Sequence, residues 1–396
     1  MEFSLIQKLL KVLFGNTISA VMFFVYFIFA ARDLSIYQFG LLSILYALSL
    51  VLADASDFGT GLYALLEKND VQIESTDDRF RKLSVTRLTF FFSISPVALV
   101  SIFFYQTHSL SVISILCCGL AMSLRILLQT DLRFQRKYTQ LGISQVCDRL
   151  GSLVFLFLMS PNTANGALLA ITISNLLTLI IFRWKPIPKI DFRKMIYVYK
   201  QASSVGISSL MSDLALLDIL ILATISDPIV VAKYSLVARF CAPVLLVGAT
   251  VSLVAVKELN IEFTRESDLR KRTRKLLCLT LGACLSLSAA IFLATDSIVG
   301  RYLPMQYRDA NGLLACALFG SILFVIWQVI SSVFQSQTMY SKNLVFTATI
   351  GISYLLIILL LTRVLNQYAI PVAQVLVYSM SIIFGTRFLM RGMGRN

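Results

Sequence analysis

Seven ionisable residues lie inside long apolar stretches of the sequence, where charged groups are costly. They are Asp54, Asp57, Asp148, Arg149, Asp213, Asp218 and Arg239. At the centre of a bilayer each would cost roughly 3 kcal/mol, so seven of them facing lipid would cost on the order of 20 kcal/mol. That sum exceeds the free energy of unfolding of a typical protein. Most of these groups must therefore face a polar interior or one another.

The arginines in these stretches could bind an anion within the membrane. A guanidinium donates two parallel hydrogen bonds to phosphate oxygens and stays charged when it loses water. Arg149 and Arg239 are therefore candidates for a cationic cavity, the alternative being a buried ion pair with a nearby carboxylate. Arg125, four residues before Gln129, is a further candidate. It lies about one turn from the expected inner end of its helix, so snorkelling to the headgroups explains it equally well.

The carboxylates leave two interpretations open. Asp54, Asp57, Asp148, Asp213 and Asp218 could balance the charge of the arginines, or some could carry a coupling ion. A desolvated carboxyl group can exchange a proton near neutral pH, so H+ or Na+ coupling is an expectation. Asp54 and Asp57 are three residues apart and would share one face of a helix.

The sequence lacks the motifs of several other chemistries. It contains no Gly-x-x-x-x-Gly-Lys-Ser/Thr phosphate loop, no Gly-x-Ser-x-Gly nucleophile elbow and no His/Cys cluster with metal-ligand spacing. The seven cysteines lie in or beside apolar stretches, where small buried residues are the usual role of cysteine. We therefore expect a protein that is not an enzyme and holds no metal or cofactor. An ion gradient, or the substrate's own gradient, would power any transport.

The elements that position these residues are long apolar helices. Of the 396 residues, 57% are hydrophobic and only 14% are charged, whereas soluble domains carry about 25% charge. A spanning helix needs about 20 mostly apolar residues. We expect an all-α polytopic membrane protein with twelve spans, at 12–31, 41–65, 85–105, 109–129, 141–160, 166–182, 201–225, 231–256, 276–297, 311–334, 343–362 and 370–390.

The distribution of basic residues predicts how these spans are oriented. The net charge is +14, and 27 of the 35 Lys and Arg residues fall on the side of the N-terminus while five fall on the other. This asymmetry predicts that both termini are cytoplasmic. Because the basic residues lie between apolar stretches without interleaved aromatic residues, no nucleic-acid partner is expected. A basic segment at 183–200 with two prolines separates six spans from six, which predicts an N-terminal bundle at 1–200 and a C-terminal bundle at 201–396.

Three short segments resemble a known family. Asn16-Thr17 lies in the first span, Ala31–Leu41 reads Ala-Arg-Asp-Leu-Ser-Ile-Tyr-Gln-Phe-Gly-Leu at the first outer turn, and Asp57-Phe58-Gly59 follows in the second span. With the length and the six-plus-six division, the chain resembles bacterial oligosaccharide flippases. These form the polysaccharide transporter family, which handles O-antigen and other polysaccharide repeat units, within the multidrug/oligosaccharidyl-lipid/polysaccharide exporter superfamily.

The resemblance implies a function and a mechanism. It implies two six-helix bundles around a central cavity in the bacterial inner membrane, rocking between inward- and outward-facing states. The substrate would be an undecaprenyl-diphosphate-linked oligosaccharide, flipped to the outer leaflet for lipopolysaccharide or other surface glycan. In that family basic cavity residues bind the diphosphate or acidic sugars, a role that Arg149, Arg239 and Arg125 could take here. A polysaccharide polymerase and a chain-length regulator would be partners, beside membrane lipids.

Two other functions stay open at this point. An exporter of small cationic compounds with the same fold would use Asp54, Asp57 and Asp213 as ligands. A membrane-embedded polysaccharide polymerase or ligase would be an enzyme, but such proteins usually carry one long outer loop, and every expected outer loop is short.

Overall fold

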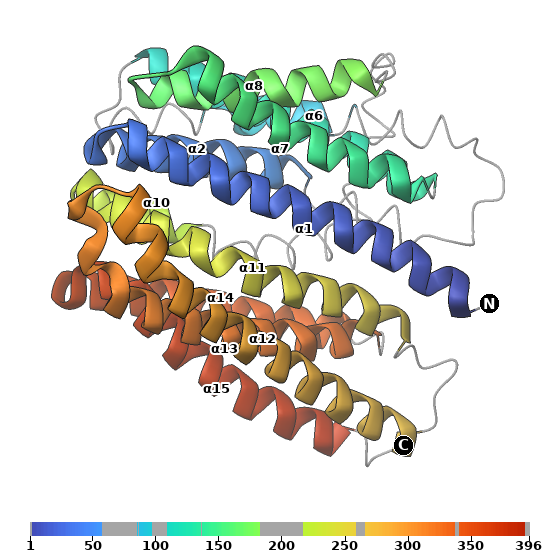
Figure 1. Ribbon diagram of the computed structural model, residues 1–396. Helices are drawn as coiled ribbons and strands as arrows, with labels where there is room; N and C mark the ends of the chain where they lie inside the picture. Colours follow the sequence, from blue (N-terminus) through green and yellow to red (C-terminus); the bar gives the residue numbers. More distant parts are fainter. Residues whose placement is uncertain are drawn as a thin grey trace. The chain divides into compact units, whose positions relative to one another are not determined.

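The computed structural model describes residues 2–57, 85, 87–96, 109–135, 137–182, 217–258, 266–336 and 340–392. Every regular element in these ranges is helical (Figure 1), so the predicted all-α fold is confirmed. The chain divides into two compact units, Met1–Thr224 and Ile225–Asn396. The predicted boundary at residue 200 lies outside the described ranges and stays a prediction.

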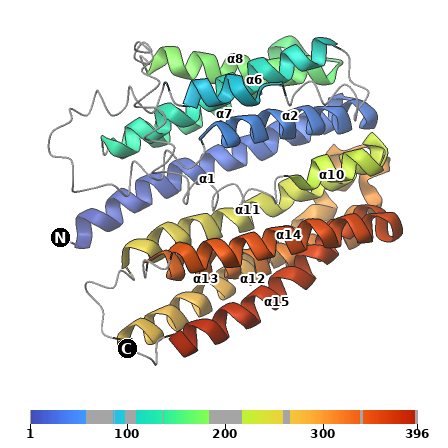
Figure 2. The ribbon, with the colours of Figure 1, turned by 180° about the vertical axis from the view of Figure 1, so that it is seen from behind.

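The first unit is built from long helices that lie side by side. Its described elements are α1 (Glu2–Asp33), α2 (Ile36–Asp57), α6 (Ser109–Phe134), α7 (Tyr138–Met159) and α8 (Ala164–Ile181), and the short α10 (Asp218–Ile225) crosses into the second unit. α7 packs along both α1 and α8, while α6 packs along α2 and α8. Figures 1 and 2 show the axes of these long helices running in similar directions within the unit.

Two hydrogen bonds show how the helices of the first unit alternate in direction. The Gln38 side chain near the start of α2 accepts a hydrogen bond from the backbone N–H of Ala164, the first residue of α8, at 2.9 Å. Asn165 of α8 donates to Ser111 at the start of α6 at 3.2 Å. α2, α6 and α8 therefore start at the same end of the unit, and α7, which joins α6 to α8, runs in the opposite direction.

Close approach of backbones joins α1 to α7. A Cβ atom built on Gly15 would lie only 2.6 Å from the Cα atom of Gly142. Small residues let membrane helices approach this closely, because dispersion contacts replace the hydrophobic driving force that lipid removes. The Gly15–Gly142 contact thus holds α7, which carries Asp148 and Arg149, against α1.

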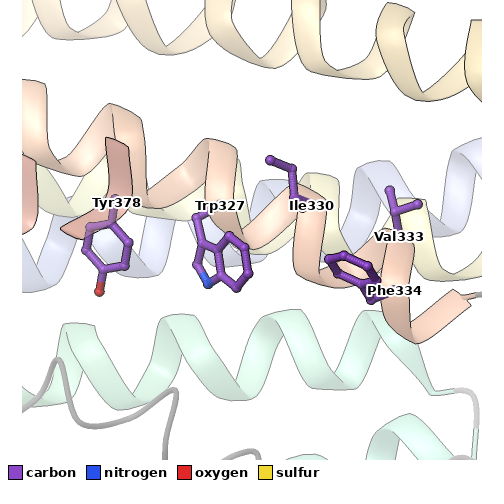
Figure 3. Packing of buried hydrophobic residues seen from close by; sticks show 5 residues of the cluster. All are labelled: Trp327, Ile330, Val333, Phe334 and Tyr378. Atoms are coloured by element: carbon purple, nitrogen blue, oxygen red, sulfur yellow. The ribbon is translucent and has the colours of Figure 1, made fainter. Parts of the chain in front are cut away.

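The second unit is organised around one central helix. Its described elements are α11 (Pro228–Glu258), α12 (Glu266–Tyr302), α13 (Asn311–Ser336), α14 (Tyr340–Leu365) and α15 (Ala369–Gly392), with short 3-10 turns η3 (Met305–Ala310) and η4 (Asn366–Tyr368). α13 packs against α11, α12 and α15. Figure 3 shows the core cluster that α13 and α15 form, with Trp327, Ile330, Val333, Phe334 and Tyr378.

The helices are long and apolar enough to cross a bilayer. Nine such segments occur in the described part of the chain, and the last, Asn343–Arg387, covers most of both α14 and α15. Large apolar side chains such as Leu293, Leu360 and Val364 are more than 70% exposed, as lipid-facing residues are. The protein is therefore a multi-pass membrane protein. Two expected spans, 85–105 and 201–225, lie partly outside the described residues, so the count of twelve stays a prediction.

The Gly15–Gly142 contact predicts a stability difference between two matched substitutions. Gly15→Ala should lower the free energy of unfolding by about 1–3 kcal/mol, because its methyl group meets backbone that cannot rotate away. Gly282→Ala on α12 is the control, since a Cβ atom there meets nothing within 4 Å. Thermal unfolding of both variants in detergent measures the difference. Equal unfolding midpoints for the two variants would show that the close approach does not exist.

Candidate functional site

The first unit contains a buried cluster in which two arginines share one carboxylate oxygen. Arg125 Nη1 of α6 lies 3.1 Å from Asp148 Oδ2 of α7, and Arg149 Nε lies 3.4 Å from the same atom. The Asp148 side chain is fully buried, and the two arginine side chains are only 11% and 12% exposed. Asp148 is therefore paired with two arginines, as the charge-balance interpretation expects.

Several polar atoms of this cluster make no hydrogen bond within the described residues. They are Arg125 Nε, Arg149 Nη1 and Asp148 Oδ1. Buried polar groups in native proteins are nearly always hydrogen-bonded to protein, water or ligand. The cluster is thus suited to accept water or a polar ligand, and its guanidinium N–H groups favour oxygen acceptors.

Asp148 is held in place through its backbone. Its carbonyl oxygen accepts hydrogen bonds from the hydroxyl groups of Ser152, at 2.9 Å, and Ser174 of α8. Gly151 makes the contact with α8 possible, because a Cβ atom there would collide with Ser174 Oγ. Residues on two helices therefore fix the carboxylate that positions both arginines.

The guanidinium of Arg149 also lies over an aromatic ring. Its guanidinium carbon is 3.7 Å from the centroid of the Phe23 ring on α1. Such a cation–π contact contributes about 0.5–2 kcal/mol, more when it is shielded from water. The sequence analysis missed Phe23, because a phenylalanine in an apolar helix carries no signal that separates it from packing residues.

A second buried arginine pairs with the end of α2. Arg87, in the helical residues 87–94, lies 3.1 Å from Asp57 Oδ1 and donates from Nε to Ser123 Oγ of α6 at 3.2 Å. Ser123 in turn lies 2.7 Å from Ser56 Oγ. Arg87 stands at the edge of the expected span 85–105, and its side chain is only 1% exposed. The apolar stretch 85–105 already contained it, and that was the available signal.

Asp54 differs from its two neighbouring carboxylates. Asp57 pairs with Arg87 and Asp148 with two arginines, whereas Asp54 makes no direct ion pair or hydrogen bond within the described part of the chain. It is mostly buried, and Arg87, Asp57 and Arg125 act on it electrostatically. Of Asp54, Asp57 and Asp148, Asp54 is therefore the one without a direct ion pair within the described residues.

The depth of Arg125 corrects one expectation. The helix was expected to end near residue 129, which would let Arg125 snorkel to the inner headgroups. α6 instead continues to Phe134, so Arg125 lies about 13 Å before its end at 1.5 Å per residue. Its side chain turns to Asp148 instead of following the helix outward. The snorkelling interpretation is therefore wrong.

The remaining candidates lie away from this cluster or outside the described ranges. Arg239 is half-buried on α11 of the second unit, four residues before Pro243. Asp218 is buried and begins α10. Asp213 lies outside the described residues. Within those ranges, no group of three or more His, Cys, Asp or Glu side chains could hold a metal ion.

The shared oxygen predicts that Asp148 is essential to stability. Asp148→Asn keeps the shape of the side chain but leaves two buried guanidinium groups without their counter-charge, so it should cost about 3–5 kcal/mol of unfolding free energy. Adding Arg125→Met should recover part of the loss. Asp33→Asn is the control, because its pair with Arg32 is nearly half exposed on both sides. Thermal unfolding in detergent gives the unfolding midpoints of the single variant, the double variant and the control. An Asp148→Asn midpoint equal to that of Asp33→Asn would contradict the pairing.

Comparison with known proteins identifies the fold. No protein-family model and no curated protein sequence match the chain. Solved structures do match. The lipid II flippase MurJ, in an inward closed conformation, superposes with a TM-score of 0.72 at 12% identity, over 95% of this chain and 87% of that one.

Other matches are transporters of the MOP superfamily. An inward-facing multidrug resistance MATE transporter gives a TM-score of 0.64 at 13% identity, over 96% and 95% of the two chains. A MOP superfamily transporter from Pyrococcus furiosus, described as having a binding pocket of reversed polarity, gives 0.59 at 12% identity, over 99% and 96%. The chain therefore has the fold of MOP superfamily transporters.

Proposed function

We propose that the protein flips an undecaprenyl-diphosphate-linked oligosaccharide repeat unit across the bacterial inner membrane. Movement from the cytoplasmic to the outer leaflet would occur by alternating access, and the product would feed assembly of surface polysaccharide such as O-antigen. The protein would act as a transporter and not as an enzyme. The observation that carries the proposal is the sharing of one Asp148 oxygen by Arg125 and Arg149 at membrane depth.

The direct contacts in this cluster leave more positive charge and more donors than the carboxylate can satisfy. Two guanidinium groups meet one carboxylate, and one N–H-bearing nitrogen of each makes no hydrogen bond within the described residues. A buried cation that lacks full compensation costs several kcal/mol. A diphosphate would remove that cost, because its oxygens accept paired hydrogen bonds from guanidinium groups.

The fold supports a lipid-linked substrate. MurJ, which superposes over 95% of this chain, is a lipid II flippase. The fold also occurs in multidrug transporters, so export of small cationic compounds is a second candidate. Asp54 favours that candidate, because a mostly buried carboxylate without a direct partner in the described chain could bind a cation. A polysaccharide polymerase and a chain-length regulator would be the partners that use the flipped product.

The coupling ion, in this proposal, binds at Asp54. The other two carboxylates of the cluster already have guanidinium partners at 3.1 Å, which repel an added cation. A proton or Na+ on Asp54 would change the charge acting on Arg125, and through it the affinity for an anion. Asp54 thereby couples an ion gradient to binding of the diphosphate.

Substitution of the arginines tests the substrate. In a cell that depends on this chain for flipping, Arg149→Ala and Arg125→Ala should lower surface polysaccharide about tenfold or more, because each removes charge-assisted hydrogen bonds worth about 1.5–3 kcal/mol. Arg149→Lys should retain only part of the wild-type amount of surface polysaccharide, since an ammonium group cannot bind a phosphate bidentately. Arg239→Ala should also reduce it. Arg32→Ala, at an exposed pair, is the control.

The readouts are surface glycan, the amount of inserted protein and undecaprenyl-linked glycan on the inner leaflet. Normal glycan in the Arg125→Ala and Arg149→Ala strains would remove the substrate assignment. If these strains lost drug resistance but kept normal surface glycan, the result would favour export of small cationic compounds.

The role of Asp54 has its own test. Asp54→Asn should still flip substrate down its gradient in proteoliposomes, but should no longer respond to an imposed proton or sodium gradient, because the amide cannot bind the ion. Asp33→Asn, at the exposed pair, should respond like the wild type. A full response in Asp54→Asn would place the coupling ion elsewhere.

A further inference from the structure

We propose that Phe23 is a positioning residue of the anion site. Its ring holds the guanidinium of Arg149 flat, so that the N–H groups at the guanidinium edge point to a phosphate oxygen. This inference rests on the proposed function and adds a residue to its binding site that the sequence pattern did not indicate.

Arg149 contacts both the ring of Phe23 and the carboxylate of Asp148. Its guanidinium carbon lies over the ring, 3.7 Å from the Phe23 centroid. Its Nε atom is 3.4 Å from Asp148 Oδ2, longer than the 2.7–2.9 Å typical of a charge-assisted hydrogen bond. Nη1 makes no hydrogen bond within the described residues.

Stacking and anion binding use different parts of the guanidinium. Its N–H groups donate in the plane of the group, whereas the aromatic ring contacts the face of that plane. The two interactions therefore do not compete. An arginine that already lies on a ring loses less conformational freedom when a phosphate binds its edge.

The Phe23 ring is itself held by other aromatic side chains. Tyr26 stacks on it with centroids 6.0 Å apart, Phe27 meets it edge-on at 4.9 Å, and Tyr46 of α2 lies at 5.4 Å. Tyr26 donates a hydrogen bond to the backbone oxygen of Ala167 on α8 at 2.7 Å. Residues of three helices thus hold the ring in place. Because Arg149 of α7 lies over this ring, the fixed ring restricts where its guanidinium can lie.

Removal of the ring is expected to weaken binding of a diphosphate without affecting a neutral lipid. The probes are undecaprenyl diphosphate and undecaprenol, added to the purified full-length protein in lipid nanodiscs. Phe23→Leu should weaken the affinity for the diphosphate about three- to tenfold, and Phe23→Tyr should retain it. Undecaprenol binding should not change in either variant.

Phe39→Leu is the matched control. Phe39 is fully buried and packs edge-on against Phe27 of the same aromatic group. Its described ring contact is with Phe27 and not with Arg149. Its loss should lower the unfolding midpoint but leave diphosphate affinity unchanged. If Phe23→Leu does not fold, ring-fluorinated phenylalanine at position 23 keeps the shape while weakening the π face, and affinity should fall as fluorine is added.

A double-mutant cycle separates positioning from packing. Phe23→Leu should have no further effect on diphosphate affinity when Arg149 is already Ala. If Phe23→Leu weakens binding equally in both backgrounds, or in neither, the positioning role is contradicted while the proposed function stands. If the wild type and Arg149→Ala bind undecaprenyl diphosphate equally well, the proposed function fails at this site, and the positioning role fails with it.

Discussion

The carboxylate of Asp148 is the constraint on which the first unit depends. One of its oxygens meets both Arg125 and Arg149, and its own backbone carbonyl is held by hydroxyl groups from α7 and α8. Taken out of water, an arginine needs a fixed counter-charge nearby. The bundle supplies one directly paired carboxylate for two guanidinium groups. The helices must therefore stay packed to hold that carboxylate in place, and its single negative charge does not balance both arginines.

The neighbouring charges show how such a site can be tolerated at membrane depth. Arg87 and Asp57 neutralise each other at 3.1 Å, and the serines at positions 56 and 123 extend that pair. Phe23 stabilises Arg149 without neutralising it, since a ring face attracts a cation but carries no net charge. Pairing therefore removes some of the charge, and stacking keeps the rest available to a ligand.

The sequence predicted the helical fold and the intramembrane charges, and it failed where the answer depends on contacts. Asp148 and Arg149 stand out because charge in an apolar stretch is costly whatever surrounds it. The depth of Arg125 was misjudged because hydropathy falls near Gln129, whereas α6 continues as a helix to Phe134. Arg87 was not among the expected site residues, because it lies at the edge of an apolar stretch and its partners come from other helices. Phe23 has no sequence signal, since its role depends on which side chain lies over its ring.

A cryo-EM structure of the protein with undecaprenyl diphosphate bound would test the central claim most directly. We expect a phosphate group within hydrogen-bond distance of Arg149 Nη1 and close to Arg125, with Asp148 still contacting both arginines. A diphosphate bound elsewhere, with its phosphates remote from both guanidinium groups, would contradict the claim that this shared-carboxylate cluster is the anion site.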